Sequence, residues 1–332
     1  MKKAFLFILL LISFSCKDLI ITEPASNMNI EDFEAAWKRI KDVYPYFQFK
    51  KINWDSIYTM YLPRADQARG DDFFYVLNDL LAELKDGHVY YRIKGGSKIY
   101  PYYPPRHFKD RHAYSPFVVR KYFDKELLLT PSKTVEYEIL PGNIGYAFIS
   151  GFLENYLIDE FAGVLEYLKN TKGLILDIRQ KRGGQYKNIE AVISRFLSQP
   201  LARNFAYSFG VKWNLPPFQP GGDFQYLNPV VVLINGSTFS AGEFTTEILK
   251  QLPQVTAVGD TTGGGSVGSG DEGLFFLPSG KSIEIGFIDF RRYDGLPWEW
   301  LGVEPDIRIE QTEADILAGR DKQLEYAIEI LK

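Results

Sequence analysis

The feature that most constrains the fold is the alternation of apolar and amphipathic segments that begins at Ile144. Runs such as GLILDIR and PVVVLIN are apolar nearly throughout, as strands are when a parallel sheet buries both of its faces. The segments between them, such as NIEAVISRFL, carry apolar residues at helical spacing. This alternation predicts an α/β fold with a layered core, in which helices cover a mainly parallel sheet. We assign residues 141–332 to this core.

A small helical domain is predicted ahead of the core, over residues 29–95. Apolar residues between Phe33 and Tyr44 recur at helical spacing, and Pro45 ends that helix. A second helix follows, and a third lies within DDFFYVLNDLLAELKDG, with its apolar residues on one side. His88 comes directly after the third segment, at the start of an expected strand, VYYRI.

Residues 96–140 separate the two parts and have an irregular pattern that is rich in Tyr and Pro. Pieces such as FVVRKYF and ELLLT are β-like, so we expect an irregular linker that contains short β segments. Near the other end of the chain, LFFLPSGKSIEIGF predicts a hairpin and QLEYAIEIL a closing helix. The predicted order is therefore a helical domain, a linker and an α/β core.

The first residues, MKKAFLFILLLISFSC, are typical of an export signal. Two lysines precede an apolar run that is too short to span a bilayer, so residues 1–15 are predicted to be a signal peptide. Cys16, the only cysteine, follows this run as the lipidated cysteine does in a bacterial lipoprotein, and residues 16–28 then form a tether to the membrane. The alternative is a plain secretory signal with an incidental cysteine. In both cases we expect the mature protein to work outside the cytoplasm. The lipid anchor would place it in the bacterial cell envelope, facing the periplasm or the surface.

Composition and motif spacing exclude several classes of function. With 45% apolar residues, 24% charged residues and a formal charge of −4, the chain has no basic excess to hold nucleic acid. The glycine pattern in TTGGGSVGSG does not open a helix, and SGKS lacks the upstream glycine of a Walker loop. The three histidines do not have metal-ligand spacing. We therefore expect no nucleic-acid partner, no cofactor and no metal ion.

The segment NGSTFSAGEF follows the apolar run PVVVLI and opens a helix. Ser240 is expected at the first turn of that helix, where free N–H groups favour a developing negative charge. A helix cap is the simpler role for a serine in this place. As a nucleophile, Ser240 would have the N–H of Ala241 as an oxyanion donor and would need a histidine or lysine base. Glu243, one helical turn later, is expected to be structural.

Four segments of the chain together resemble the C-terminal processing and tricorn-type serine peptidases. In chain order they are LKDGHV, GLILDIRQKRGG, NGSTFSAGE and WLGVEPDIRIE. The resemblance implies a Clp-protease/crotonase-like layered core and hydrolysis of peptides through an acyl-enzyme. No PDZ-sized insertion is evident, which favours the tricorn-like or retinoid-binding-protein-like branch of the family.

The resemblance also implies an oxyanion hole at the nucleophile. Carried over by position, Ser240 is the nucleophile, and the N–H groups of Gly184 and Ala241 bind the oxyanion. Paired glycines let a backbone come close to a substrate. Gly183 is the alternative donor to Gly184.

The base implied by the resemblance is a histidine. Gly264 stands where the processing branch has its lysine, so a serine–lysine pair is not possible. The tricorn-type branch uses a histidine at the position of His88, and Glu299 matches a glutamate that supports it. Gly87 replaces the serine that precedes the histidine in tricorn proteases. We expect His88 to accept the serine proton and later to donate it to the leaving amine.

The expected function is therefore that of an extracytoplasmic serine peptidase acting on peptides or unfolded protein. The alternative is a non-catalytic carrier of an apolar ligand or a peptide on the same fold. The superfamily includes a retinoid carrier, and the aromatic content of 15% would suit an apolar cleft. The combination of Ser240, His88 and Glu299 favours the peptidase, because a carrier has no physical need for all three.

Overall fold

The structure is a computed structural model of the chain. It describes residues 27–332 except 94–95, 111, 153–156, 181–182, 204–205, 266 and 269–272. The predicted signal peptide, Cys16 and nearly all of the predicted tether lie outside the described residues. None of the described helices is both long enough and apolar enough to cross a bilayer.

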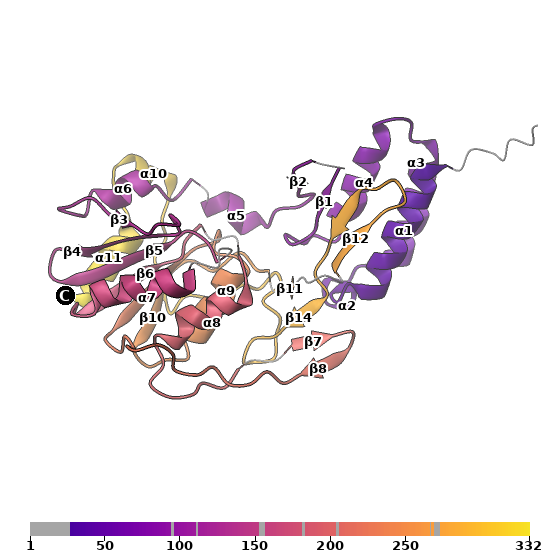
Figure 1. Cartoon of the computed structure of the whole chain (residues 1–332). Coiled ribbons are helices and arrows are strands. Elements are labelled where there is room, and N and C mark those ends of the chain that lie inside the picture. The colour runs from indigo at the N-terminus through magenta and orange to yellow at the C-terminus, as the bar shows by residue number, and fades with distance from the viewer. Residues whose placement is uncertain are drawn as a thin grey trace, which may run out of the picture.

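A seven-stranded sheet forms the centre of the larger part of the molecule (Figure 1). Its strand order is β15-β10-β9-β6-β5-β4-β3. The strands from β5 to β15 run parallel, whereas β4 and β3 are antiparallel at one edge. In chain order the strands are β3 (Leu128–Leu129), β4 (Val135–Leu140), β5 (Ile144–Ile149), β6 (Gly173–Asp177), β9 (Val230–Ile234), β10 (Val255–Gly259) and β15 (Ile307–Arg308).

Helices cover both faces of this sheet, as the alternation of segments predicts. Helices α7 (Leu157–Leu168), α8 (Tyr186–Ser194) and α9 (Ala241–Leu249) pack on one face, and α11 (Lys322–Leu331) packs on the other. Successive residues of β9 point to opposite faces. Val232 belongs to the core under α7, α8 and α9, and Leu233 belongs to the core under α11. The strand is buried along its whole length, which explains its uniformly apolar sequence. The predicted layered α/β fold is confirmed.

Four helices at the other end of the molecule enclose a separate core (Figure 1). They are α1 (Met28–Val43), α2 (Phe47–Lys50), α3 (Trp54–Gln67) and α4 (Asp72–Ala82). The side chains of Asn27 and Asn53 cap the starts of α1 and α3 by accepting backbone N–H bonds. Helix α1 ends at Val43, as the proline that follows predicts.

Two small sheets connect these helices with the rest of the chain. One has the order β12-β13-β1-β2, and its strands are β1 (Tyr90–Arg92), β2 (Lys98–Ile99), β12 (Leu274–Phe276) and β13 (Ser282–Glu284). The other has the order β11-β14-β7-β8, with β7 (Ala206–Ser208), β8 (Val211–Trp213), β11 (Val267–Gly268) and β14 (Ile288–Phe290). The predicted hairpin β12-β13 therefore pairs with β1 and packs on the helical core, although it comes from the C-terminal third of the chain.

The segment between the helices and the core differs from the sequence-based expectation in two ways. FVVRKYF was expected to be β-like, but its first four residues lie in the helix α6 (Pro116–Arg120). Pro116 suits the first position of a helix, and the helical turn buries both Val118 and Val119. VEYEIL, which fell within the expected linker, forms β4 and pairs with β5 along its whole length. The remaining helices are α5 (Pro105–Asp110) and α10 (Glu313–Leu317).

Candidate active site

Ser240 lies where strand β9 turns into helix α9. It occupies the N-cap position of α9 with φ 55° and ψ −114°. A non-glycine residue adopts such a backbone conformation at a cost of about 1–3 kcal/mol, mainly at functional sites. The N–H of Gly242 bonds to the carbonyl of Phe239 at 3.1 Å. The N–H of Ala241, at the first helical position, has no possible partner inside the helix, so α9 leaves it to bind a developing anion.

Glu243 fixes this turn from the inside. Its buried carboxylate accepts the N–H of Ser240 at 3.0 Å, the hydroxyl of Thr262 at 2.5 Å, and the N–H groups of Gly264 and Gly265 at 2.8 Å each. Burial raises the pKa of Glu243, and these four hydrogen bonds oppose that effect. The contacts agree with the expected structural role, because they tie the nucleophile's backbone to the glycine loop behind it.

Gly183 and Gly184 follow strand β6 and lie beside Ser240. Both have positive φ, at 96° and 151°. A Cβ on Gly183 would lie 2.8 Å from the Cβ of Ser240, and a Cβ on Gly184 would lie 2.2 Å from the carbonyl carbon of Phe152. Only glycine fits at these two positions. Both glycines are therefore candidate oxyanion donors next to the N–H of Ala241.

His88 reaches the same place from the segment between α4 and β1. Its imidazole stacks on the ring of Phe239 with the centroids 4.6 Å apart. Its Nδ1 lies 3.7 Å from Oδ1 of Asp86, the oxygen that accepts the backbone N–H of His88 at 2.8 Å. Among the described residues, neither ring nitrogen has a hydrogen-bond partner. The structure thus brings His88 close to the serine turn without a hydrogen bond to Ser240. Both ring nitrogens are buried, Nδ1 faces Asp86, and Nε2 has no hydrogen-bond partner among the described residues.

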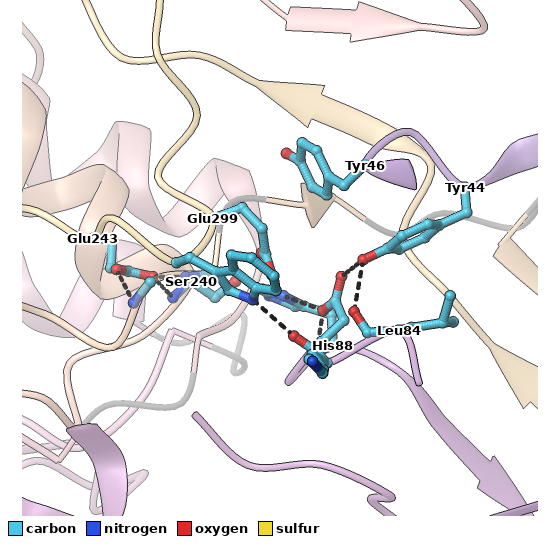
Figure 2. A network of polar contacts seen from close by, with 12 residues as sticks. Tyr44, Tyr46, Leu84, His88, Ser240, Glu243 and Glu299 are labelled. Atoms are coloured by element: carbon cyan, nitrogen blue, oxygen red, sulfur yellow. Dashed lines mark hydrogen bonds and ion pairs between the residues drawn. The ribbon is translucent and has the colours of Figure 1, made fainter. Parts of the chain in front are cut away.

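A buried ionic network centred on Lys50 lies next to His88. Figure 2 labels two of its members, Tyr44 and Glu299, together with His88. The Lys50 ammonium is 2.6 Å from Oε1 of Glu299 and 3.5 Å from Oδ2 of Asp86. It also donates to the hydroxyl of Tyr44 at 2.7 Å, and that hydroxyl donates to Asp86 at 2.7 Å. The three charged side chains are at most 2% exposed. Removing one member of such a network leaves the others buried and unpaired.

The two carboxyls of this network respond differently to burial. Burial raises the pKa of Asp86, but the Lys50 ammonium and the contacts with His88 outweigh it, so the pKa of Asp86 lies below its usual range. Burial and the charge of Asp86 raise the pKa of Glu299 to about 7, against the opposing charge of Lys50. Ligand atoms of Asp86, His88 and Glu299 lie within 4.8 Å of one another, a spacing that would suit a metal ion. Here the Lys50 ammonium balances the two carboxyls, so the group forms an ion-pair network.

One cavity of about 590 Å³ joins these elements. Ser240, Ala241, Gly184 and His88 all line it, although they come from distant parts of the sequence. Its apolar wall includes Tyr186, Ile189, Phe244, Ile288 and Phe290, and its polar wall includes Lys98, His107 and Glu284. The predicted nucleophile, base and oxyanion donors thus share one cavity, whereas Glu299 lies behind His88.

Another serine of the same turn is hydrogen-bonded to a histidine. The hydroxyl of Ser237 is 3.0 Å from Nδ1 of His107, which lies on helix α5. Ser237 is only 1% exposed, so a substrate cannot reach its oxygen. Thr238, the other hydroxyl residue before Ser240, is also buried and donates to the carbonyl of Ile178 at 3.1 Å. Of the three hydroxyls in NGSTFSAGEF, the two buried ones hold the turn and Ser240 lines the cavity.

Sequence reasoning did not identify Asp86 or Lys50 as parts of this site. Asp86 had a usable signal, because a carboxylate two residues before a histidine in LKDGHV can reach both the backbone and the ring of that histidine. Lys50 had none. It is the last residue of α2 and looks like a surface lysine, and only the folded chain buries it between Asp86 and Glu299.

Two family models match the chain. The model described as peptidase family S41 matches residues 143–309, which include Gly184, Ser240 and Glu299. The model described as the tricorn protease C1 domain matches residues 29–82, the region of the four N-terminal helices. The two matches leave His88 and Asp86 between them.

Similar proteins carry peptidase names. A carboxy-terminal-processing protease of Bartonella bacilliformis is 27% identical over 58% of this chain and 44% of its own length. Tricorn protease homolog 1 of Streptomyces coelicolor is 31% identical over 47% of this chain and 14% of its own length. The chain therefore spans less than half the length of these curated relatives. A solved structure of a proposed peptidase from Parabacteroides merdae is 26% identical and superposes with a TM-score of 0.77, covering 91% of this chain and 96% of that one.

Proposed function

Because the chain belongs to peptidase family S41, a family of serine-type hydrolases, we propose that it cleaves peptide bonds with Ser240 as the nucleophile and His88 as the general base. One observation carries this proposal. Ser240 and His88 come from distant segments, yet both line the cavity that also exposes Gly184 and Ala241. A nucleophile, a base and two backbone donors around one space are the parts that acyl transfer needs.

In this mechanism His88 takes the proton of the Ser240 hydroxyl as the serine oxygen attacks the substrate carbonyl. The oxyanion that forms binds the N–H of Ala241 together with that of Gly184 or Gly183. The imidazolium then donates its proton to the leaving amine, and a water molecule hydrolyses the acyl-enzyme in the same way. Catalytic hydrogen bonds often tighten only when substrate is bound, which fits a His88 Nε2 that has no hydrogen-bond partner among the described residues.

The carboxylates behind His88 support the base. Asp86 Oδ1 lies 3.7 Å from Nδ1 of His88, so Nδ1 faces this carboxylate and Nε2 is the nitrogen left for the serine proton. Glu299 acts through Lys50, because its 2.6 Å ion pair holds the ammonium that also faces Asp86. We therefore assign Glu299 a positioning role, with Asp86 as the carboxylate nearest to the base.

The lining of the cavity favours a peptide or unfolded protein as substrate. Tyr186, Phe244 and Phe290 form an aromatic group beside the oxyanion donors, with ring centroids 4.6 to 6.1 Å apart. Such a wall would accept an apolar side chain next to the scissile bond. The same aromatic wall is what favours the alternative, a carrier of an apolar ligand. The backbone strain at Ser240 favours the peptidase, because a carrier gains nothing from it.

The test of this function is hydrolysis by the purified chain. We expect it to cut an unfolded protein such as reduced, alkylated casein, and we expect mass spectrometry to show that cleavage is lost in His88→Ala. If intact casein persists while an apolar fluorophore such as retinol binds saturably, the carrier is the correct function.

Glu299→Gln is expected to lower kcat about tenfold or more, with a smaller change in KM. Glutamine keeps the shape of the side chain, but above about pH 7, where Glu299 is ionised, it removes the charge that pairs with Lys50 at 2.6 Å. Lys50 is then drawn toward Asp86, and the negative field on His88 weakens. Steady-state kinetics on a fluorogenic peptide measure the effect. Glu304→Gln, an exposed change on the same segment, serves as the control and is expected to be neutral. Equal rates for Glu299→Gln and wild type would remove Glu299 from the mechanism.

The stability of the same variant tests the ionisation of Glu299. Its carboxyl has a pKa of about 7 in the folded chain, above the ordinary value of 4.5, so the folded state holds a proton that the unfolded state releases. This contribution to stability is present below about pH 4.5 and is lost as the pH rises through about 7. Wild type is therefore expected to lose stability relative to Glu299→Gln between these pH values in urea titrations. A difference in stability between the two proteins that does not change with pH would contradict the raised pKa of Glu299.

We also propose that the protein is exported and attached to a bacterial membrane through a lipid on Cys16. The proposal rests on the lysine-rich start, the apolar run and the position of the only cysteine. Labelled palmitate is expected to enter the full chain expressed in bacteria and to be absent from Cys16→Ser. Equal labelling of both forms, or none of either, would contradict the anchor.

A further inference from the structure

The imidazole of His88 is held by an aromatic ring. The rings of His88 and Phe239 are 28° from parallel with their centroids 4.6 Å apart. Neither nitrogen of His88 has a hydrogen-bond partner among the described residues, and the nearest ring-to-carboxylate approach, to Asp86, is 3.7 Å. The stacking contact with Phe239 therefore restricts the plane of the imidazole.

The backbone on both sides of Phe239 is fixed by hydrogen bonds. The carbonyl of Thr238 accepts the N–H of Gly263 at 2.9 Å, and the carbonyl of Phe239 accepts the N–H of Gly242 at 3.1 Å. Ser240 is the next residue. The residue whose ring stacks on His88 is thus the sequence neighbour of Ser240. The same short backbone segment therefore positions both the nucleophile and the support of the base.

Three glycines enclose the ring of Phe239. A Cβ on Gly265 would lie 2.2 Å from two ring carbons of Phe239 and 2.8 Å from Cε1 of His88. A Cβ on Gly87 would lie 2.9 Å from Cζ of Phe239, and one on Gly263 would lie 3.0 Å from Cδ2. No larger residue fits at Gly265 without moving one of the two rings. Gly87, which replaces the serine of the tricorn-type pattern, leaves this space to Phe239.

We propose that Phe239 is a positioning residue for His88, which holds the imidazole plane beside Ser240 and stabilises the imidazolium formed during acyl transfer. This inference rests on the proposed function. The proton leaves the Ser240 hydroxyl and goes to Nε2 of His88, because Nδ1 faces Asp86. The ring then carries a positive charge within 6 Å of an aromatic face, an arrangement that lowers the energy of the cation.

Phe239→Leu is expected to lower kcat about tenfold while KM changes by less than about threefold. Leucine keeps an apolar wall for the substrate, but it has no aromatic face for the imidazole. Steady-state kinetics on a fluorogenic peptide separate the two constants. Phe123→Leu is the matched control, because Phe123 packs on Tyr146 in the core on the other face of the sheet. It is expected to leave both constants unchanged.

A spectroscopic measurement separates this role from a general loss of structure. The full chain is labelled with ¹³C at the Cε1 position of histidine, and the His88 signal is assigned among the three by its absence in His88→Ala. The stacked ring of Phe239 is expected to shift the His88 Hε1 signal upfield, and Phe239→Leu is expected to move it downfield. A wild-type signal without an upfield shift would overturn the proposal without any activity assay, even if Phe239→Leu does not fold.

The two readouts together also distinguish this proposal from the function on which it rests. A moved His88 signal with unchanged kcat would overturn the role of Phe239 and leave the peptidase intact. A lower kcat with an unmoved signal would overturn it as well, because the effect would then not pass through His88. If His88→Ala keeps full activity, it is the proposed function that fails.

Discussion

Ser240→Ala is expected to reduce kcat/KM for peptide hydrolysis by about 10⁴-fold or more, while the chain keeps its fold. Without the hydroxyl no acyl-enzyme can form, and only binding and the oxyanion donors remain to assist attack by water. The strained φ of 55° is a property of the turn, and the bond from the Ser240 N–H to Glu243 uses the backbone. Alanine therefore retains both. Loss of the N-cap side chain is expected to cost at most about 1–2 kcal/mol of stability.

Ser237→Ala is the matched control for this prediction. Both serines lie in the same turn, but the hydroxyl of Ser237 is buried and 3.0 Å from Nδ1 of His107. Its loss leaves a hydrogen-bonding group without its partner, which costs about 1–3 kcal/mol of stability. We expect kcat/KM to change by no more than about fivefold, because Ser237 does not line the cavity. Loss of activity in Ser237→Ala but not in Ser240→Ala would contradict the assignment of Ser240 as the nucleophile.

Lys50→Met is expected to have the largest effect on stability, a loss of about 3–5 kcal/mol. Methionine has similar volume, so packing changes little, but Asp86 and Glu299 would then face each other without a cation. All three side chains are at most 2% exposed, so water cannot replace the ammonium. The hydroxyl of Tyr44 would also lose the donor that lies 2.7 Å away. Urea unfolding followed by circular dichroism measures the loss of stability.

Lys38→Met provides the comparison for a lysine of the same helical region. Its ion pair with Asp42 is 2.9 Å long, but the two side chains are 73% and 52% exposed. An exposed pair of this kind contributes no more than about 0.5 kcal/mol. If Lys50→Met cost as little stability as Lys38→Met, the buried ion pairs of Lys50 would not stabilise the fold. Adding Glu299→Gln to Lys50→Met is expected to recover part of the loss, because one of the two unpaired charges is removed.

The layered core was predictable from the sequence because its pattern is local. The core strands β5, β6, β9 and β10 are short, mainly apolar runs, and each helix between them repeats its apolar residues within a few turns. FVVRKYF misled the prediction because its two valines favour strands in isolation. Pro116 starts a helix there, and the burial of Val118 and Val119 in the helical turn overrides the local preference. The pairing of β12-β13 with β1 joins segments far apart in the chain, and no local pattern encodes it.

The site was predictable only where short motifs carry it. Ser240 and His88 were found from segments that resemble a family, and the structure places both at one cavity. Lys50 and Phe239 could not be found in this way. A lysine at a helix end and a phenylalanine after a threonine have no distinctive pattern, and their roles arise only when the folded chain buries one between carboxyls and stacks the other on an imidazole.

Mapping the covalent adduct of a fluorophosphonate probe tests the central claim most directly. The purified chain is treated with the probe, digested and analysed by tandem mass spectrometry, with heat-denatured protein as the control. We expect a single adduct on Ser240 that is absent from the denatured chain and from His88→Ala. An adduct on a different serine, or labelling of Ser240 that is unchanged in His88→Ala, would contradict the pairing of this serine with this histidine.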